Sequence, residues 1–247
     1  ALLAELGIEK LLAAVGGSLG GMQVLQWTID HPGEIDGALV IAASARLSAQ
    51  NIAFSAVARE AIMRDPHFND GDYYGTGDRP DRGLGLARMI GHITYLSEES
   101  MREKFGRRIQ DAEMPRFGFD VDFQVESYLH YQGQSFVERF DANTYLYLGR
   151  VMDYFDPFRD PVKVQQQIDA GDTSYLVLSF DSDWRFSTPH SREIAAELRL
   201  AGAPVTFREI ASTHGHDSFL FAIPAYHETV AGFIDRLAAQ RKIGGVA

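Results

Sequence analysis

Apolar residues along the chain occur in two patterns, short unbroken runs and longer segments with helical spacing. The unbroken runs lie at residues 10–15, 37–44 and 174–180, and the more polar stretch VTFREI at 205–210 is a further predicted strand. A run that is apolar at nearly every position predicts a strand buried on both faces, which is typical of a parallel sheet. The segments with helical spacing that follow these runs lie at 19–32, 189–202 and 226–242. The pattern therefore predicts an α/β fold, with a mostly parallel sheet flanked by helices.

The middle of the chain lacks the strand pattern. Its apolar residues have helical spacing in segments at 48–65, 83–96, 97–108 and 141–155. Turn-rich stretches that contain several glycines, prolines and aspartates separate these helical segments. We therefore expect a helical insertion at 48–160 between two parts of one sheet domain, at 1–47 and 161–247.

Composition narrows the class of protein. A chain of 247 residues that is 45% hydrophobic can bury the core of one large domain with an insertion. Its net charge of −11 argues against binding to nucleic acid, and its lack of cysteine excludes disulfides and a thiol nucleophile. No apolar run approaches the roughly 20 residues of a membrane span and no signal peptide opens the chain, so we expect a cytoplasmic protein. We expect no metal site.

A serine between glycines follows the first apolar run. The stretch AVGGSLGG at 14–21 contains Gly16-Gly17-Ser18-Leu19-Gly20, which matches the G-x-S-x-G nucleophile elbow. In this turn the serine has a strained backbone, and small neighbours let the strand and the helix approach each other. The turn also places the backbone N–H of Leu19 at the start of a helix, where it can stabilise an oxyanion.

Candidates for an acid and a base follow in the chain order that this elbow requires. The run at 174–180 ends in DSDW, so Asp181 and Asp183 are both candidates for the acid. The run at 205–210 is followed by ASTHGHDSF, so His214 and His216 are both candidates for the base. The order Ser, Asp, His on these elements is that of an α/β-hydrolase triad.

Several further stretches resemble one family. They are VGGSLGGMQVLQW, LARMIGHITYLS, FQVESYLHYQG, RFDANTYL, SFDSDWRFS and HGHDSFL, spread over nearly the whole chain. In them the chain resembles the homoserine O-acyltransferases of the α/β-hydrolase superfamily. The resemblance implies that Ser18 is the nucleophile, Asp183 the acid and His216 the base. It also implies an upstream part with the first strands and a second oxyanion donor, which the given sequence lacks.

The resemblance also implies substrates and partners. Acyl-coenzyme A (acyl-CoA) is the co-substrate, L-homoserine is the acceptor, and no cofactor is permanently bound. Arg88 would bind the homoserine carboxylate with Tyr95 beside it, and Asp217 would hold the ammonium group. A guanidinium suits the first role because it binds a carboxylate through two parallel hydrogen bonds. The helical insertion would form a lid and a homodimer interface.

One arginine indicates which acyl group the protein transfers. Arg185 lies two residues after Asp183, where a cation could pair with the free carboxylate of a succinyl group. We therefore expect a homoserine O-succinyltransferase that uses succinyl-CoA, an early step toward methionine. The alternatives are a homoserine O-acetyltransferase that uses acetyl-CoA, a serine esterase or thioesterase of the same fold, and a binding module on a degenerate hydrolase scaffold.

Overall fold

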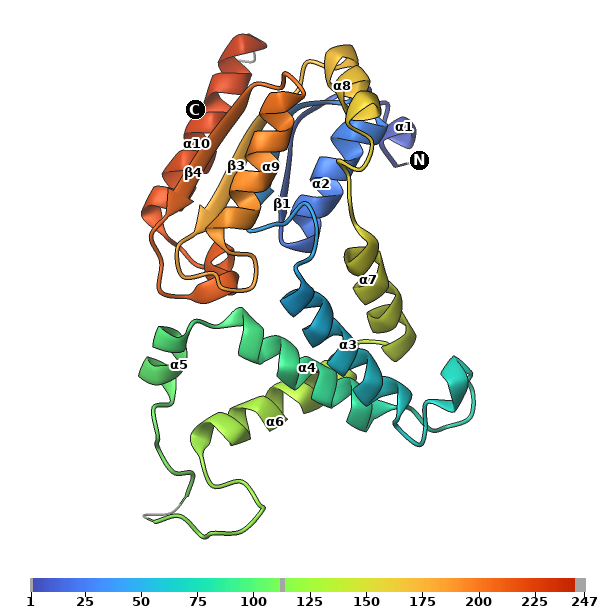
Figure 1. Ribbon diagram of the computed structural model, residues 1–247, viewed down its shortest axis with the longest axis vertical. Coiled ribbons are helices and arrows are strands. Elements are labelled where there is room, and N and C mark those ends of the chain that lie inside the picture. The colour runs from blue at the N-terminus through green and yellow to red at the C-terminus, as the bar shows by residue number, and fades with distance from the viewer. Residues whose placement is uncertain (1, 112–113, 243–247) are drawn as a thin grey trace. The chain divides into compact units, whose positions relative to one another are not determined.

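The chain divides into two compact units (Figure 1). The computed structural model describes residues 2–111 and 114–242. The sheet unit comprises residues 1–46 and 155–247, and the helical unit comprises Leu47–Tyr154. The predicted α/β class is confirmed, because the sheet unit carries a parallel sheet with helices on its faces.

The sheet has four parallel strands in the order in which they occur along the chain. They are β1 (Leu11–Gly17), β2 (Ile35–Ile41), β3 (Ser174–Phe180) and β4 (Val205–Ile210). All of β2 and nearly all of β3 are buried, which explains why both read as unbroken apolar runs. All of the strands lie within a few residues of the predicted runs.

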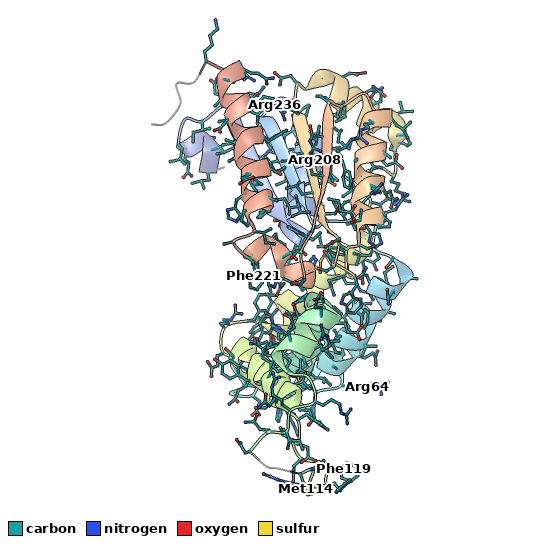
Figure 2. All side chains as sticks on the ribbon, turned by 90° about the vertical axis from the view of Figure 1, so that its left-hand side faces the viewer. Arg64, Met114, Phe119, Arg208, Phe221 and Arg236 are labelled. Atoms are coloured by element: carbon teal, nitrogen blue, oxygen red, sulfur yellow. The ribbon has the colours of Figure 1, made fainter. Side chains whose placement is uncertain are left out.

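Helices α2 (Leu19–Asp30), α9 (Thr188–Leu200) and α10 (Pro224–Gln240) cover the faces of this sheet. The sheet unit also contains α1 (Leu2–Glu5), α8 (Pro161–Ala170), which contacts α2, and a 3₁₀ helix η2 (Gly215–Leu220). Phe233 and Leu237 of α10 pack on Leu39 and Leu176, and Figure 2 shows α10 and α9 on opposite sides of the sheet. The sequence patterns did not predict α8.

The helical unit is built from α3 (Ala49–Met63), α4 (Asp81–Tyr95), α5 (Glu98–Lys104), α6 (Gln124–Val137) and α7 (Ala142–Tyr154), with a 3₁₀ turn η1 (Asn69–Gly71). Its core joins Ile62 of α3, Leu84 and Ala87 of α4, and Phe136 of α6. The sequence patterns predicted the other helices but not α6, which packs along α4.

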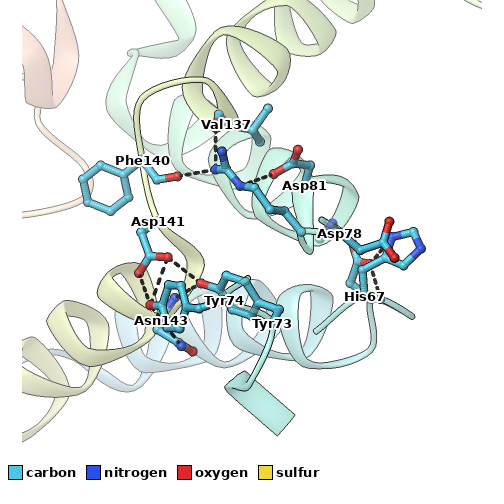
Figure 3. A network of polar contacts seen from close by, with 12 residues as sticks. His67, Tyr73, Tyr74, Asp78, Asp81, Val137, Phe140, Asp141 and Asn143 are labelled. Carbon is cyan, nitrogen blue, oxygen red and sulfur yellow. Dashed lines mark hydrogen bonds and ion pairs between the residues drawn. The ribbon is translucent and has the colours of Figure 1, made fainter. Parts of the chain in front are cut away.

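A network of polar contacts fixes the long loop between α3 and α4 (Figure 3). The hydroxyls of Tyr73 and Tyr74 both donate to the carboxylate of Asp141, at 2.5 and 3.1 Å. The guanidinium of Arg79 donates to the backbone oxygens of Val137 and Phe140. These contacts join the loop to the turn between α6 and α7. The loop is therefore held in place by hydrogen bonds within the helical unit.

The carboxyl ends of the parallel strands determine where chemistry can occur. Ser18 follows β1 directly, Asp181 follows β3, and Ala211 follows β4. Because the strands are parallel, these ends meet at one edge of the sheet, where ligands bind in open α/β sheets. The sequence candidates for nucleophile, acid and base therefore converge within the sheet unit.

Candidate active site

Ser18 occupies a strained turn between β1 and α2. Its backbone has φ 57° and ψ −123°, a conformation that non-glycine residues seldom adopt. The N–H of Ser18 donates to the carbonyl of Ile41 at 2.9 Å, which holds the turn against the end of β2. The predicted nucleophile elbow is therefore present as a structure.

At two of the glycines, a side chain would clash with neighbouring atoms. A Cβ on Gly16 would lie 2.1 Å from the carbonyl oxygen of Gly20, and one on Gly17 would lie 2.7 Å from the ring of Phe219. A Cβ on Gly20 would meet nothing within 4 Å. The close approach of β1 and α2 thus depends on Gly16, whereas Gly17 makes room for the Phe219 ring of η2.

A continuous hydrogen-bonded chain joins Ser18 to a histidine and an aspartate. The Nε2 atom of His216 lies 2.8 Å from Ser18 Oγ, and its Nδ1 atom lies 2.8 Å from Asp183 Oδ2. An ionised carboxylate only accepts, so Nδ1 carries the proton and Nε2 is left as the acceptor for the serine hydroxyl. His216 and Asp183 are 3% and 2% exposed, so the contact between them is buried, and the contact between His216 and Ser18 is partly buried.

The carboxylate of Asp183 is itself fixed by the backbone. Its Oδ1 atom accepts hydrogen bonds from the N–H groups of Arg185 and Phe186, at 3.0 and 2.9 Å. One oxygen is thereby held by the loop and the other is aimed at His216. The ring of Phe186 packs edge-on against His216, with 5.1 Å between ring centres.

Asp181 and His214, the alternative acid and base, do not take part in the hydrogen bonds that join Ser18, His216 and Asp183. Asp181 Oδ1 accepts from the N–H of Ser212 at 2.8 Å, and the His214 ring stacks on Phe221 with 4.1 Å between ring centres. The geometry therefore separates the pairs that the sequence pattern left open, and Asp183 and His216 are the members that connect to Ser18.

Leu19 is the first residue of α2. The first N–H groups of an α-helix have no intrahelical acceptor, and the helix dipole is positive at this end. The N–H of Leu19 therefore belongs to the group of donors available to an oxyanion next to Ser18.

Arg185 and Asp217 lie close in sequence to the acid and the base of the triad. Arg185 is half-buried, with its guanidinium 5.5 Å from the centre of the Phe186 ring that packs on His216. Asp217 is half-buried and follows His216 in η2. Both charged groups are thus carried by the loops that hold the acid and the base.

Arg88 and Tyr95 lie on α4 in the helical unit. The guanidinium of Arg88 stacks between aromatic rings, 4.6 Å from the centre of Phe136 and 5.5 Å from that of Tyr95. Among the described residues, the Nε atom of Arg88 is sealed from solvent without a hydrogen-bond partner. Leaving a buried donor unpaired costs about 1–3 kcal/mol.

A glycine lets Tyr95 lie back along its own helix. A Cβ on Gly91 would be 3.1 Å from the hydroxyl oxygen of Tyr95, so the phenol rests where that side chain would project. This arrangement places the hydroxyl one helical turn from Arg88. Arg88 and Tyr95 therefore share one face of α4.

His92 is a polar residue of this face that sequence reasoning missed. It is 7% exposed, and its Nδ1 lies 3.1 Å from the hydroxyl of Tyr128 on α6. Burial, assisted by the charges of Arg88, Lys104 and Arg139, lowers the pKa of His92 to about 4. The spacing of Arg88, His92 and Tyr95 in LARMIGHITY was the signal that could have indicated a polar helix face.

Within residues 2–111 and 114–242, no helix is long and apolar enough to cross a bilayer. In the same residues, no group of three or more His, Asp or Glu side chains is arranged to hold a metal ion.

Comparison with known proteins identifies the family of this fold. The family model described as the alpha/beta hydrolase fold matches residues 1–222. The chain belongs to the α/β-hydrolase family. Among solved structures, a homoserine O-acetyltransferase from Bacillus anthracis matches with a TM-score of 0.82 and 21% identity, over 94% of this chain and 62% of that one. This likeness supports the fold.

Curated relatives are closer in sequence. A homoserine O-succinyltransferase of Magnetococcus marinus is 53% identical over 242 residues, which cover 96% of this chain and 61% of the relative. A homoserine O-acetyltransferase of Rhodopseudomonas palustris is 51% identical over 245 residues, which cover 99% of this chain and 61% of the relative. The chain thus spans about three fifths of the length of these relatives, and its predicted resemblance to homoserine O-acyltransferases is confirmed.

Proposed function

We propose that the protein transfers an acyl group from acyl-CoA to the hydroxyl of L-homoserine through an acyl-serine intermediate. The observation that carries the proposal is the series of hydrogen bonds from the buried Asp183 through His216 to Ser18 on a strained elbow. The names of relatives about half identical to this chain give the substrate class.

In the first half-reaction, Ser18 Oγ attacks the thioester carbonyl of acyl-CoA while its proton passes to Nε2 of His216. The Leu19 N–H stabilises the oxyanion that develops on the carbonyl oxygen. The C–S bond then breaks, His216 returns its proton to the sulfur, and CoA leaves with a free thiol. Asp183 holds the imidazole in the required tautomer and stabilises its transient positive charge.

In the second half-reaction, His216 removes the proton from the homoserine hydroxyl, which attacks the acyl-serine ester. Collapse of the second tetrahedral intermediate releases O-acylhomoserine, and His216 protonates Ser18. The resemblance to homoserine O-acyltransferases assigns Arg88 and Tyr95 to binding of the acceptor carboxylate, and Asp217 to binding of its ammonium group. The unpaired, buried Nε of Arg88 supports this assignment, because an acceptor carboxylate would satisfy it.

The acyl donor is succinyl-CoA in this proposal, and Arg185 is its selector. Arg185 is half-buried on the loop of the acid, and it packs on the ring that contacts His216. A succinyl group on Ser18 ends in a carboxylate, which is costly in such a place without a cation. Acetyl-CoA is the alternative donor, because similarly close relatives are named acetyltransferases.

The helical unit serves as a lid in this proposal. Closing an acyl-enzyme off from water slows hydrolysis, which would otherwise compete with transfer to the amino acid. We also propose a homodimer that forms through this unit. Large apolar side chains exposed on its helices support that interface, among them Val57, Leu86, Ile93, Tyr147 and Val151. A cytoplasmic location fits a role in an early step toward methionine.

The proposal is tested by the release of CoA thiol in the full-length enzyme, with and without homoserine. Without homoserine, we expect release to stop after one CoA thiol per active site. With homoserine, we expect CoA thiol to be released continuously. The Ser18→Ala variant should release none in either case. Continuous release at the full rate without homoserine would identify a thioesterase and contradict the proposed transfer.

A further inference from the structure

Three consecutive residues after β3 each accept a hydrogen bond from the loop after β4. Asp181 Oδ1 accepts from the N–H of Ser212 at 2.8 Å, and Ser182 Oγ accepts from the N–H of Gly215 at 3.0 Å. Asp183 Oδ2 then meets Nδ1 of His216 at 2.8 Å. The DSD stretch therefore holds the loop of the base at three successive points, of which only the third belongs to the triad.

We propose that Asp181 and Ser182 are positioning residues that set the place of His216 between Asp183 and Ser18. The inference rests on the proposed function, since it concerns the efficiency of the same triad. It assigns a role to two side chains that do not touch a substrate or a reacting atom.

The sheet explains how this arrangement arises. Strands β3 and β4 are parallel neighbours whose last residue pair is Phe180 and Ile210. The N–H of Asp181 continues the ladder by donating to the carbonyl of Ile210 at 3.1 Å. Both segments thus leave the sheet side by side. The side chains of residues 181–183 can therefore form hydrogen bonds with successive positions of the segment after β4.

A second set of contacts holds the same segment, residues 212–218, from within. The N–H of His214 donates to Ser212 Oγ at 3.2 Å, and Ser212 Oγ lies 2.8 Å from Ser218 Oγ. Ser218 Oγ donates in turn to the carbonyl of Gly215 at 2.6 Å. The N–H of Gly215 is held by Ser182 and its carbonyl by Ser218, so the residue just before His216 has little freedom.

Small displacements at such a site have large kinetic effects. A shift of about 1 Å in a catalytic group can cost about 100-fold in rate. Loops have more conformational freedom than the strands that carry them, so their contacts decide the precision of the site. We therefore expect loss of either positioning side chain to lower the rate of acylation without weakening the binding of substrates.

The experiment compares Ser182→Ala and Asp181→Ala with wild type in the full-length enzyme. We expect kcat for acylation to fall by about 10- to 100-fold, with KM values for acyl-CoA and homoserine changed less than about twofold. Ser182→Thr and Asp181→Asn keep an oxygen acceptor and should restore most of the rate. Ser187→Ala is the matched control, because Ser187 lies near the same loop and its hydroxyl oxygen lies 3.4 Å from Nδ1 of His190, a residue outside the triad.

Proton NMR supplies a readout that a merely structural role would not move. The Nδ1 proton shared by His216 and Asp183 should give a far-downfield resonance in wild type, which broadens or shifts in both alanine variants at unchanged Tm. Alanine variants with wild-type kcat and an unchanged resonance would overturn the proposal while leaving acyl transfer intact. A fall in rate that follows only from a lower Tm, without rescue by Ser182→Thr, would also overturn it.

Discussion

Asp183→Asn is the substitution that tests the geometry of the triad most closely. In the wild type, Oδ1 of Asp183 accepts from the N–H groups of Arg185 and Phe186, while Oδ2 faces Nδ1 of His216. The asparagine side chain has one oxygen and one NH₂ group. Its oxygen must take the place next to the two backbone donors, because an NH₂ group there would face two N–H groups. The NH₂ group is thereby forced toward His216.

This placement reverses the tautomer of the histidine. With a donor opposite it, Nδ1 of His216 becomes an acceptor and the proton moves to Nε2, which then points at Ser18 Oγ. A protonated Nε2 cannot remove the serine proton. We expect kcat for acylation to fall by about 10⁴-fold, which corresponds to about 5.5 kcal/mol in activation free energy.

The assay is a rapid-quench measurement of CoA thiol release from the full-length enzyme, with near-UV circular dichroism to verify the fold. Asp181→Asn is the matched control, because its amide oxygen can still accept from the N–H of Ser212. We expect the control to lose no more than a few-fold in rate. A rate for Asp183→Asn within about tenfold of wild type, or equal losses in both variants, would refute the assigned geometry.

The remaining predictions concern the other charged and titratable residues. Arg88→Lys should raise the KM for homoserine by about 10- to 100-fold and leave acylation of Ser18 nearly unchanged, because lysine cannot bind a carboxylate through two bonds. Equal losses in both half-reactions would mean that Arg88 acts structurally. Arg185→Leu should lower the preference for succinyl-CoA over acetyl-CoA by about 10- to 100-fold in a competition assay, and an unchanged ratio would remove Arg185 as the selector. His92, with its pKa lowered to about 4, stays neutral in the folded chain while the unfolded chain takes up a proton below about pH 6.5. Stability is therefore lost as pH falls through this window, by about 2 kcal/mol between pH 7.5 and pH 5, and urea unfolding of His92→Gln should show a smaller loss. An equal loss in the variant would show that another group titrates.

The strands were predictable because their burial leaves a direct trace in the sequence. Each of β2 and β3 is covered on both faces, so nearly every position is apolar. The elbow was predictable for a similar reason, since the close approach of β1 and α2 requires a glycine at position 16 and the contact with the Phe219 ring requires one at position 17.

The missed helices show the limits of pattern reasoning. Helix α6 contains Gly133 and many aromatic residues, which have modest helix propensity. It is stable because Gly133 lies against Gly85 of α4, where a Cβ on Gly133 would be 2.9 Å from the Gly85 carbonyl oxygen. Helix α8 begins at Asp160 and Pro161 and buries only Val164, so its apolar pattern is weak. Tertiary packing decides α6. Helix α8 instead depends on its N-terminus, where Asp160 caps the helix by accepting from the N–H of Lys163 at 3.0 Å and proline occupies the first position.

The site was predictable only in part. The order of Ser18, the acids and the histidines along the chain indicated a triad, but the choice between neighbouring candidates came from the family resemblance. The contacts of Asp181 and Ser182 could not be predicted, because they depend on the register between β3 and β4. The pairing of His92 with Tyr128 likewise depends on how α4 and α6 pack.

Peptide mapping by mass spectrometry tests the central claim most directly. The full-length enzyme is mixed with succinyl-CoA, quenched with acid before homoserine is added, and digested. The account predicts that the peptide containing Ser18 gains the mass of one succinyl group on that residue, and that a chase with homoserine removes it as O-succinylhomoserine. An adduct on another residue, or an adduct whose succinyl group is not transferred to homoserine in the chase, would contradict the account.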